Sequence, residues 1–309
     1  MTTVAVKGAA SAVGHLLVLG GGYTGQRLAR SAAAQGIPVT LTHRQPEAPP
    51  PLAPGCRWLR FDPASGHSPE EDALADVTHA VVTIPPTASG EDPALVHLGP
   101  CLQRLGLAWL GYLSTTGVYG DHQGAWVHED TPVGPNQERS RRRLAAEEGW
   151  RRLGLPLQVF RLPAIYGPSR SPFADLRAGR ARLIHKPGQV FCRIHVDDIV
   201  GALWHNLMRG ATERPDTLIL ADTLPCPSSE TLGYAAHLLG VRLPPLQSFA
   251  NLEPTLSPMA RSFWSENRRV SSALLREGLG YVLRYPTYRE GYRACLAEEE
   301  AAGRDASGS

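Results

Sequence analysis

The stretch Gly20-Gly21-Gly22-Tyr23-Thr24-Gly25 lies directly after the apolar residues 15–19 and opens a segment rich in Ala, Leu and Arg, 25–35. Its first, third and sixth residues fit the spacing G-x-G-x-x-G, a weak signal alone and a strong one between a strand and a helix. There, Gly20 permits a tight turn, Gly22 lets the main chain approach a pyrophosphate, and Gly25 lets the helix pack close to the sheet. The pyrophosphate would lie at the helix N-terminus, beside Tyr23 and Thr24. The stretch therefore predicts a dinucleotide-binding turn, with a plain glycine-rich loop as the alternative.

Further apolar, strand-like runs alternate with helix-like stretches along the next 140 or so residues. This alternation is typical of parallel βαβ units, and six strands are the number that a doubly wound dinucleotide-binding sheet uses. A seventh run, 217–222, is expected to rejoin the sheet. The fold class is therefore predicted as α/β, a doubly wound parallel (Rossmann) sheet with a smaller C-terminal substrate lobe. The five runs after the first are 38–42, 58–61, 80–84, 109–114 and 157–162.

The expected domain organisation follows from where this alternation ends. Residues 15–166 are predicted to form the dinucleotide-binding domain, to which 193–222 returns. The irregular segment 167–192, rich in Pro, Arg and Gly, is predicted to form the substrate lobe together with 223–297. Residues 1–14 and 298–309 are expected to be flexible termini, the second because it is acidic and ends in Gly and Ser.

Bulk composition narrows the classes of partner. The 309 residues are 42% hydrophobic and carry a formal charge of only +2, so neither a nucleic-acid nor a membrane partner is expected. No apolar run reaches the ~18 residues that a membrane helix needs. The 5 cysteines are far apart and the 11 histidines show no metal-ligand spacing. These features predict no metal site, no disulfide framework and a cytoplasmic location.

Residues after the second, third and fourth strands bear on the choice of cofactor. Arg44 stands near the position where an NAD enzyme usually has Asp or Glu for the ribose hydroxyls. An arginine can pair bidentately with a 2′-phosphate, which favours NADP over NAD, although an ordinary exposed arginine is the alternative. Asp62 could accept a hydrogen bond from the adenine amine or serve as a turn residue. Pro85, just after 80–84, completes the predicted cofactor site.

Four segments taken together resemble one known family. Besides 20–25 they are Leu113-Ser-Thr-Thr-Gly-Val-Tyr-Gly120, Phe160-Arg-Leu-Pro-Ala-Ile-Tyr-Gly-Pro168 and Arg193-Ile-His-Val-Asp-Asp198. In this order, they make the chain from about residue 15 to 292 similar to the extended and atypical short-chain dehydrogenase/reductase family, also called the NAD-dependent epimerase/dehydratase family. The resemblance implies a nicotinamide cofactor and a small-molecule substrate. Homodimers are common in the family, but an arginine run on helix 137–153 leaves a monomer equally open.

In this family a Ser or Thr, a Tyr and a Lys carry the chemistry: the Tyr transfers a proton while the nicotinamide transfers hydride. Thr115 occupies the Ser/Thr position. Aligning Glu147 with the Glu of the family's Lys-x-x-x-Glu pattern puts Arg143 at the lysine position and Arg139 at the tyrosine position. Arginine cannot serve as a general acid/base, because it stays protonated, although Arg143 could hold cofactor hydroxyls or a substrate anion. The chain thus resembles the atypical subgroup with a degraded Tyr-Lys active site.

Two residues are candidates to replace the missing tyrosine. Tyr119 would lie at the C-terminal edge of the sheet, where doubly wound folds bind ligands, although a packed structural aromatic is equally compatible. The ordinary pKa of histidine suits proton transfer near neutrality, so His195 is the second candidate, with ordering of its loop as the alternative role. Asp197 or Asp198 is predicted to be the N-cap of the helix that begins at Ile199.

This chain lacks the residues with which members of the family act on nucleotide sugars. Dehydratases of the family have an Asp-Glu pair where this chain has Thr116-Gly117, and epimerases grip a diphosphate with an arginine where this chain has Phe191. The segment 167–192 is also short. The resemblance therefore points to a small substrate rather than a nucleotide sugar.

Two functions remain open from the sequence. The favoured one is an NADP-dependent oxidoreductase or epimerase-like enzyme that acts on a small carbonyl or hydroxyl substrate. The other is a non-catalytic NADP(H)-binding sensor or partner-binding protein, which the replacement of Tyr and Lys by Arg139 and Arg143 supports. Fold analogy does not decide between them, because one fold hosts many chemistries.

Overall fold

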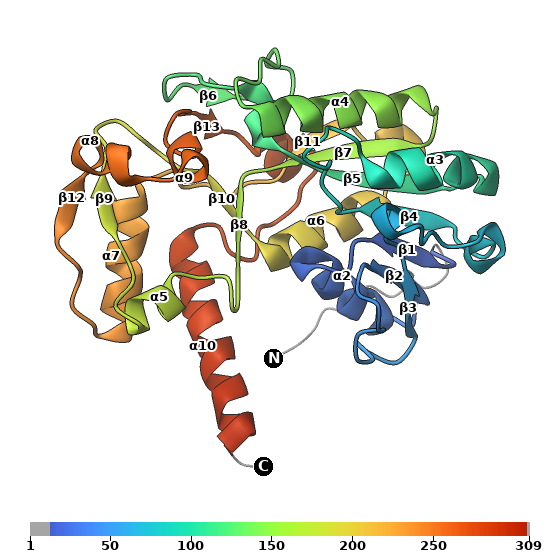
Figure 1. Ribbon diagram of the computed structural model, residues 1–309, viewed down its shortest axis with the longest axis horizontal. Helices are drawn as coiled ribbons and strands as arrows, with labels where there is room; N and C mark the ends of the chain where they lie inside the picture. The colour runs from blue at the N-terminus through green and yellow to red at the C-terminus, as the bar shows by residue number, and fades with distance from the viewer. Residues whose placement is uncertain (1–12, 308–309) are drawn as a thin grey trace. The chain divides into compact units, whose positions relative to one another are not determined.

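The central feature of the computed structural model, which describes residues 13–307, is a seven-stranded sheet in the order β11-β7-β5-β4-β1-β2-β3 (Figure 1). The β3–β2, β2–β1, β1–β4 and β4–β5 pairs are parallel. The doubly wound fold is confirmed, including the return of the chain at β11. The strands are β1 (Leu16–Leu19), β2 (Val39–His43), β3 (Cys56–Arg60), β4 (His79–Val82), β5 (Trp109–Thr115), β7 (Leu157–Leu162) and β11 (Thr217–Ile219).

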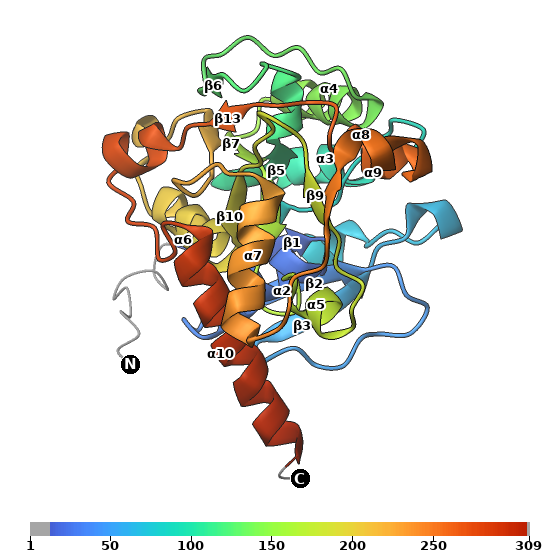
Figure 2. The ribbon, with the colours of Figure 1, turned by 90° about the vertical axis from the view of Figure 1, so that its left-hand side faces the viewer.

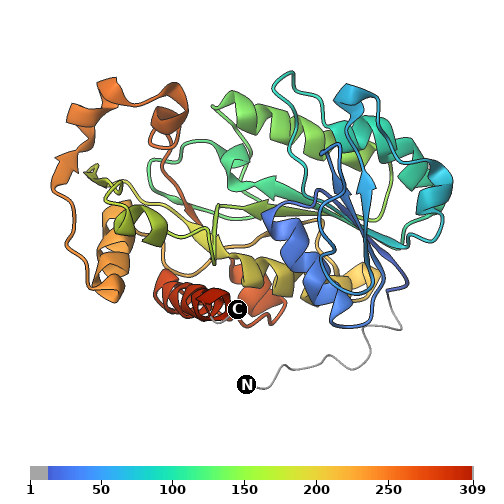
Figure 3. The ribbon, with the colours of Figure 1, turned by 60° about the horizontal axis from the view of Figure 1, so that its bottom comes forward.

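Helices cover both faces of this sheet, with α3 (Pro93–Leu105) and α4 (Glu138–Arg152) on one face and α2 (Tyr23–Ala33) and α6 (Val196–Leu207) on the other (Figures 1 and 3). All four residues of β1 are buried, as expected for a parallel strand covered on both sides. α2 buries Leu28, Ala29 and Ala32 at helical spacing. Because strand order reverses at β1, the glycine stretch that follows β1 emerges at the switch point where such folds bind ligands.

Contacts between residues divide the described chain into two compact units. Unit 1 comprises residues 13–115, 138–161 and 200–218, and holds most of the sheet. Unit 2 comprises 116–137, 162–199 and 219–307. Residues 116–137, expected within the dinucleotide-binding domain, group here with unit 2.

Unit 2 is built from short elements around an aromatic core. α7 and α10 lie side by side (Figure 2), and their buried core includes Tyr166, Phe173, Tyr288 and Tyr292. Three parallel strand pairs, β6–β13, β8–β10 and β9–β12, complete the unit. The strands are β6 (Trp126–Val127), β8 (Ala164–Tyr166), β9 (Leu183–His185), β10 (Arg193–His195), β12 (Leu246–Ser248) and β13 (Arg269–Val270). The helices are α5 (Phe173–Arg177), α7 (Ser228–Leu239), α8 (Phe249–Leu252), α9 (Pro258–Ser262) and α10 (Tyr288–Ser307).

Two local expectations are wrong. The segment 298–307 is not a flexible tail, because α10 continues through it, with Glu299 accepting hydrogen bonds from Ser171 and Arg177. Neither Asp197 nor Asp198 is an N-cap, because α6 begins at Val196 and both lie in its first turn. The Asp198 carboxylate instead accepts the backbone N–H groups of Arg284 and Tyr285 at 2.7 and 3.0 Å. Of the expected flexible N-terminus, 1–14, residues 1–12 lie outside the described part of the chain.

Candidate functional site

The glycine turn after β1 is held by two threonines from neighbouring segments. Thr42 Oγ1 accepts the N–H of Gly20 at 2.8 Å, and the Thr42 carbonyl accepts the N–H of Gly21 at 2.8 Å. Thr83 Oγ1 donates to the Gly20 carbonyl, also at 2.8 Å. Gly20 has a φ of +109°, which only glycine adopts readily. The turn is therefore fixed before any ligand arrives.

The other three glycines of the turn differ in the space around the position that a Cβ would take: it is occupied at two of them and open at the third. A Cβ on Gly25 would lie 2.1 Å from the Gly20 carbonyl oxygen, and one on Gly21 would lie 2.1 Å from the Trp58 ring. A Cβ on Gly22 would meet nothing within 4 Å. Gly22 is the N-cap of α2, no side chain caps that end, and the first turn carries no acidic residue. This open, uncapped helix N-terminus fits the pyrophosphate of a dinucleotide.

Alanine at Gly22 and alanine at Gly25 are expected to have opposite effects. Gly22→Ala should leave the unfolding free energy close to that of the wild type, because φ is −81° and the space is open, while NADPH binding weakens by about tenfold or more. Gly25→Ala should cost roughly 1–3 kcal/mol of stability through overpacking. Urea unfolding and NADPH titration of both variants would check this. Equal NADPH affinity in Gly22→Ala and wild type would show that the turn does not hold the cofactor.

Two arginines lie at the carboxyl ends of β2 and β3. Arg44 is exposed directly after β2, and Arg60 ends β3, where it pairs in register with His43. Arg60 Nη1 hydrogen-bonds His67 Nε2 at 2.9 Å, while its buried Nε has no partner among the described residues. Burial, aided by the Arg60 charge, lowers the pKa of His43, so His43 adds no charge at neutral pH. No acidic residue lies on β2 or β3, so the chemistry of this edge suits an anionic group.

Asp62 and Pro85 lie in the loops that follow neighbouring strands. The main chain of Asp62 closes a tight turn by exchanging hydrogen bonds with His67 at 2.8 and 3.0 Å, and Asp62 precedes the short helical turn Pro63–Ser65 without capping it. Pro85 is exposed two residues after Thr83. Both stay predictions as cofactor contacts.

Thr115 is the last residue of β5 and is half-buried, and α4 brings Arg143 to the same strand. Arg143 Nη1 donates to the Leu113 carbonyl at 3.0 Å and to the Tyr112 hydroxyl at 3.2 Å. That hydroxyl in turn hydrogen-bonds the buried Asp92 carboxyl, whose pKa is raised by burial. Arg143 is thus fixed against β5, whereas Arg139, one turn earlier on α4, is exposed.

Glu147, the residue by which α4 is aligned with the family pattern, lies in a buried ion pair. Glu147 is fully buried and accepts two hydrogen bonds from Arg161, at 2.8 and 3.3 Å, and one from the Ser114 hydroxyl. Arg151 adds a contact at 3.5 Å. Glu147 therefore joins α4 to β5 and β7.

The two candidate proton-transfer residues both belong to unit 2 and both are buried. Tyr119 is 2% exposed in the helical turn Thr116–Tyr119. His195 is 1% exposed, its Nδ1 accepts the Asp197 N–H at 3.1 Å, and its Nε2 lies 3.6 Å from Cys295 Sγ. The His195 ring also packs on Tyr285, with ring centroids 4.1 Å apart. Both ring nitrogens of His195 are engaged, which favours the loop-ordering role.

Within the described residues, no group of three or more His, Cys, Asp or Glu side chains could hold a metal ion. Over the same part of the chain, no helix combines the length and apolar character needed to cross a membrane.

Comparison with known proteins places this geometry in a family. No family model and no curated protein matches the chain, but solved structures do. A conserved protein of unknown function from Silicibacter pomeroyi DSS is 42% identical, with a TM-score of 0.82, over 93% of this chain and 99% of its own. A protein of Methylobacillus flagellatus, provisionally described as an NAD-dependent epimerase/dehydratase, is 25% identical over 93% and 99%, with a TM-score of 0.69. The chain belongs to the extended and atypical short-chain dehydrogenase/reductase family. The human epimerase family protein SDR39U1, solved with NADPH, shares the fold at 18% identity and a TM-score of 0.68, over 91% of this chain and 99% of its own.

Several residues of this candidate site were not found from the sequence. Thr42 and Thr83 hold the glycine turn, and Arg60 adds a second cation beside Arg44. Arg60 is the last residue of β3 and Arg44 directly follows β2, so a rule that examines the residues around the end of every strand would have found Arg60 as well. The partnership of Asp92 with Tyr112 and Arg143 has no local sequence signal.

Proposed function

We propose that the protein is an NADP-dependent oxidoreductase or epimerase-like enzyme that acts on a small carbonyl or hydroxyl compound. The observation that carries the proposal is the open cradle at Gly22, where the uncapped N-terminus of α2 follows a turn already fixed by Thr42 and Thr83. Helix N-termini of this kind bind the pyrophosphate of dinucleotides. The NADPH in the fold neighbour SDR39U1 is consistent with the same class of cofactor here.

The preference for NADP rests on charge at the ends of β2 and β3. A 2′-phosphate needs cationic donors, and Arg44 and Arg60 are the two guanidinium groups at this edge. An NAD enzyme would usually have a carboxylate there to accept from the ribose hydroxyls. No carboxylate lies on either strand.

When bound, the nicotinamide would supply hydride transfer. Thr115 would hydrogen-bond the substrate oxygen, and Arg143, held by Leu113 and Tyr112, would keep a positive charge beside β5. We assign proton transfer to Tyr119 rather than His195, since Tyr119 lies four residues after Thr115, at the end of the helical turn that follows β5. A small substrate is proposed because Thr116-Gly117 and Phe191 replace the family's groups for nucleotide sugars.

Arg44→Ala is expected to bind NADPH about ten- to hundredfold more weakly than the wild type, because hydrogen bonds to a charged phosphate are worth roughly 1.5–3 kcal/mol. NADH affinity should change little, since NADH lacks the 2′-phosphate. Titration of the purified protein with NADPH, NADP, NADH and NAD measures both effects. Arg30→Ala, which removes an exposed arginine from the last turn of α2, is the matched control. Equal losses for NADPH and NADH in Arg44→Ala would remove the NADP assignment.

The second candidate, a non-catalytic NADP(H)-binding sensor, is favoured by one observation: Arg143 and Arg139 leave α4 without a titratable group at the family's Tyr and Lys positions. Incubation of the NADPH complex with a panel of carbonyl compounds separates the two. Slow oxidation by one compound, reduced in Thr115→Ala and Tyr119→Phe, supports the enzyme. Tight NADPH binding without turnover, with different affinities for the oxidised and reduced forms, supports the sensor.

A further inference from the structure

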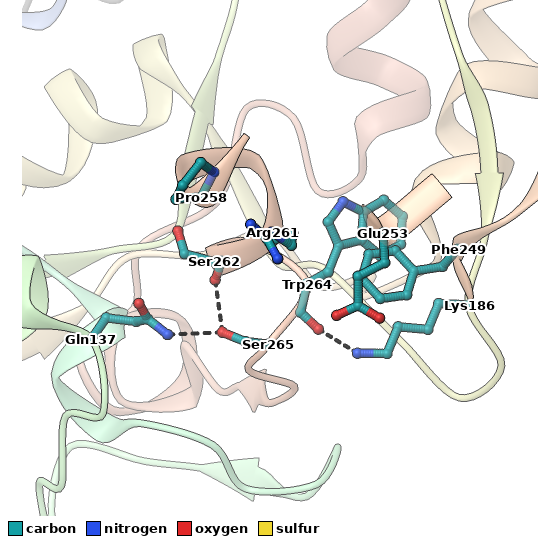
Figure 4. Close-up of a pocket in the computed structure, with 9 residues that line it drawn as sticks. All are labelled: Gln137, Lys186, Phe249, Glu253, Pro258, Arg261, Ser262, Trp264 and Ser265. Atoms are coloured by element: carbon teal, nitrogen blue, oxygen red, sulfur yellow. Dashed lines mark hydrogen bonds between the residues drawn. The ribbon is translucent and has the colours of Figure 1, made fainter. Parts of the chain in front are cut away.

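A surface cavity of about 360 Å³ lies within unit 2, between Gln137, Lys186 and the segment 249–265 (Figure 4). Its volume is in the range of small-molecule sites in proteins. All of its walls belong to unit 2, so its shape does not depend on unit 1. It uses none of the residues assigned above to the cofactor or to catalysis.

One wall of the cavity is aromatic. The Phe249 and Trp264 rings are stacked, with centroids 5.2 Å apart and an interplanar angle of 28°. Phe191 meets the Trp264 ring edge-on at 5.1 Å, so the indole is held from two directions. Phe249 is only 8% exposed and supports Trp264, so the part-exposed indole is the apolar surface that this wall offers to a planar ligand.

Lys186 provides a positive charge beside that wall. Its Nζ donates a hydrogen bond to the Trp264 carbonyl and lies 5.0 Å from the Phe249 ring centroid (Figure 4). A lysine ammonium has three donors, so two remain. The chain has 31 basic residues but only two lysines, Lys7 and Lys186. An ammonium at this position is therefore unusual for an otherwise arginine-rich protein.

The neutral polar groups of the cavity are satisfied by one another. Gln137 Nε2 donates to Ser265 Oγ at 2.8 Å, Ser265 Oγ donates to the Ser262 carbonyl at 3.0 Å, and Ser262 Oγ donates to the Met259 carbonyl at 2.7 Å. The hydroxyl protons are therefore already used. The donors left for a ligand among the lining residues are the second Nε2 proton of Gln137, the Trp264 indole N–H, and the N–H groups of Lys186 and Arg261, and only the last two residues carry charge.

The charged side chains that line the cavity have a net charge of +1. Lys186 and Arg261 contribute two positive charges and Glu253 one negative, and no ion pair joins any of the three to another side chain in residues 13–304. Two cations with unused donors and one opposing carboxylate favour a monoanion over a dianion. The aromatic wall favours a ligand with a planar body.

We propose that this cavity binds a small organic carboxylate with a planar, unsaturated body. The carboxylate would accept from Lys186 and Arg261, and the planar body would pack against Trp264, whose ring Phe249 and Phe191 hold in place. The inference extends the proposed function. It rests on that function only in taking the bound carboxylate to be part of the substrate. Binding itself needs no cofactor.

The test is calorimetric titration of the full-length protein, without nicotinamide cofactor, with benzoate, cinnamate, the neutral benzyl alcohol, and acetate. Saturable binding of benzoate or cinnamate is expected, with benzyl alcohol and acetate at least about tenfold weaker. Lys186→Gln and the exposed Arg261→Gln should each weaken carboxylate binding by about tenfold, and Glu253→Gln should strengthen it several-fold. Arg182→Gln, an exposed cation one residue before β9 and outside the cavity, is the matched control.

Each outcome decides the proposal. The opposite signs for Glu253→Gln and Arg261→Gln would support it, even if Lys186→Gln failed to fold. Absence of saturable binding by both carboxylates, equal affinity for benzyl alcohol, or equal losses in Arg182→Gln and Arg261→Gln would overturn it. Because no cofactor is present, such a failure leaves the NADPH titration of Arg44→Ala unaffected, and the two proposals fail separately.

Discussion

Glu147→Ala is expected to lose about 3–5 kcal/mol of unfolding free energy, the typical cost of removing one partner of a buried ion pair. Glu147 is fully buried and holds the Arg161 guanidinium, which is itself only 6% exposed, by two hydrogen bonds. Alanine would leave that guanidinium buried without its carboxylate and the Ser114 hydroxyl without its acceptor. Urea unfolding at neutral pH would measure the loss.

The matched control is Glu138→Ala at the first turn of the same helix. Glu138 pairs with Arg141 and Arg142 at 2.8 and 3.1 Å, but its side chain is 55% exposed. Ion pairs at the surface contribute little, because water and salt screen them. Equal losses in the two variants would mean that the buried pair of Glu147 with Arg161 contributes no more to stability than the surface pairs of Glu138.

The fold could be predicted because its signals are local. β1 is a short apolar run, and α2 shows its buried face in the spacing of Leu28, Ala29 and Ala32. The glycine turn could be predicted for the same reason, since the tight turn and close packing concern residues within six positions. Composition misled at 298–307, where polar residues continue α10 because Glu299 has partners 122 and 128 residues away along the chain.

The partners in the candidate site could not be predicted, because the sheet brings together residues that are distant in the sequence. Thr83 meets Gly20 from 63 residues away, and Arg143 meets Tyr112 from 31 residues away. Asp198 shows the same limit: its place before a helix suggested an N-cap, but its partners Arg284 and Tyr285 belong to a segment more than 80 residues later. A pattern rule assigns such a residue its commonest local role, whereas tertiary contacts decide the actual one.

Ionisation of the Asp222 carboxyl is expected to make the stability of the folded protein depend strongly on pH. It is 2% exposed, its Oδ1 accepts the Leu224 N–H at 3.2 Å, and its buried Oδ2 has no hydrogen-bond partner among the described residues. Burial raises the pKa of Asp222 to about 7, although the Arg193 charge opposes this. A buried carboxylate oxygen without a donor is costly when ionised, so the folded state favours the neutral acid.

The sign of the effect follows from this raised pKa. Below about pH 4 the carboxyl is neutral in both folded and unfolded chains, and its contribution is fully present. As pH rises toward 7, the unfolded chain ionises while the folded one resists, so stability is lost, by up to about 4 kcal/mol for a shift of roughly three units. Asp222→Asn removes this titration. The unfolding free energy of the wild type, relative to Asp222→Asn, should therefore fall between about pH 4 and 7 and level off above it. If the difference in unfolding free energy between the wild type and Asp222→Asn stays constant across that range, Asp222 ionises in the folded protein as readily as in the unfolded chain.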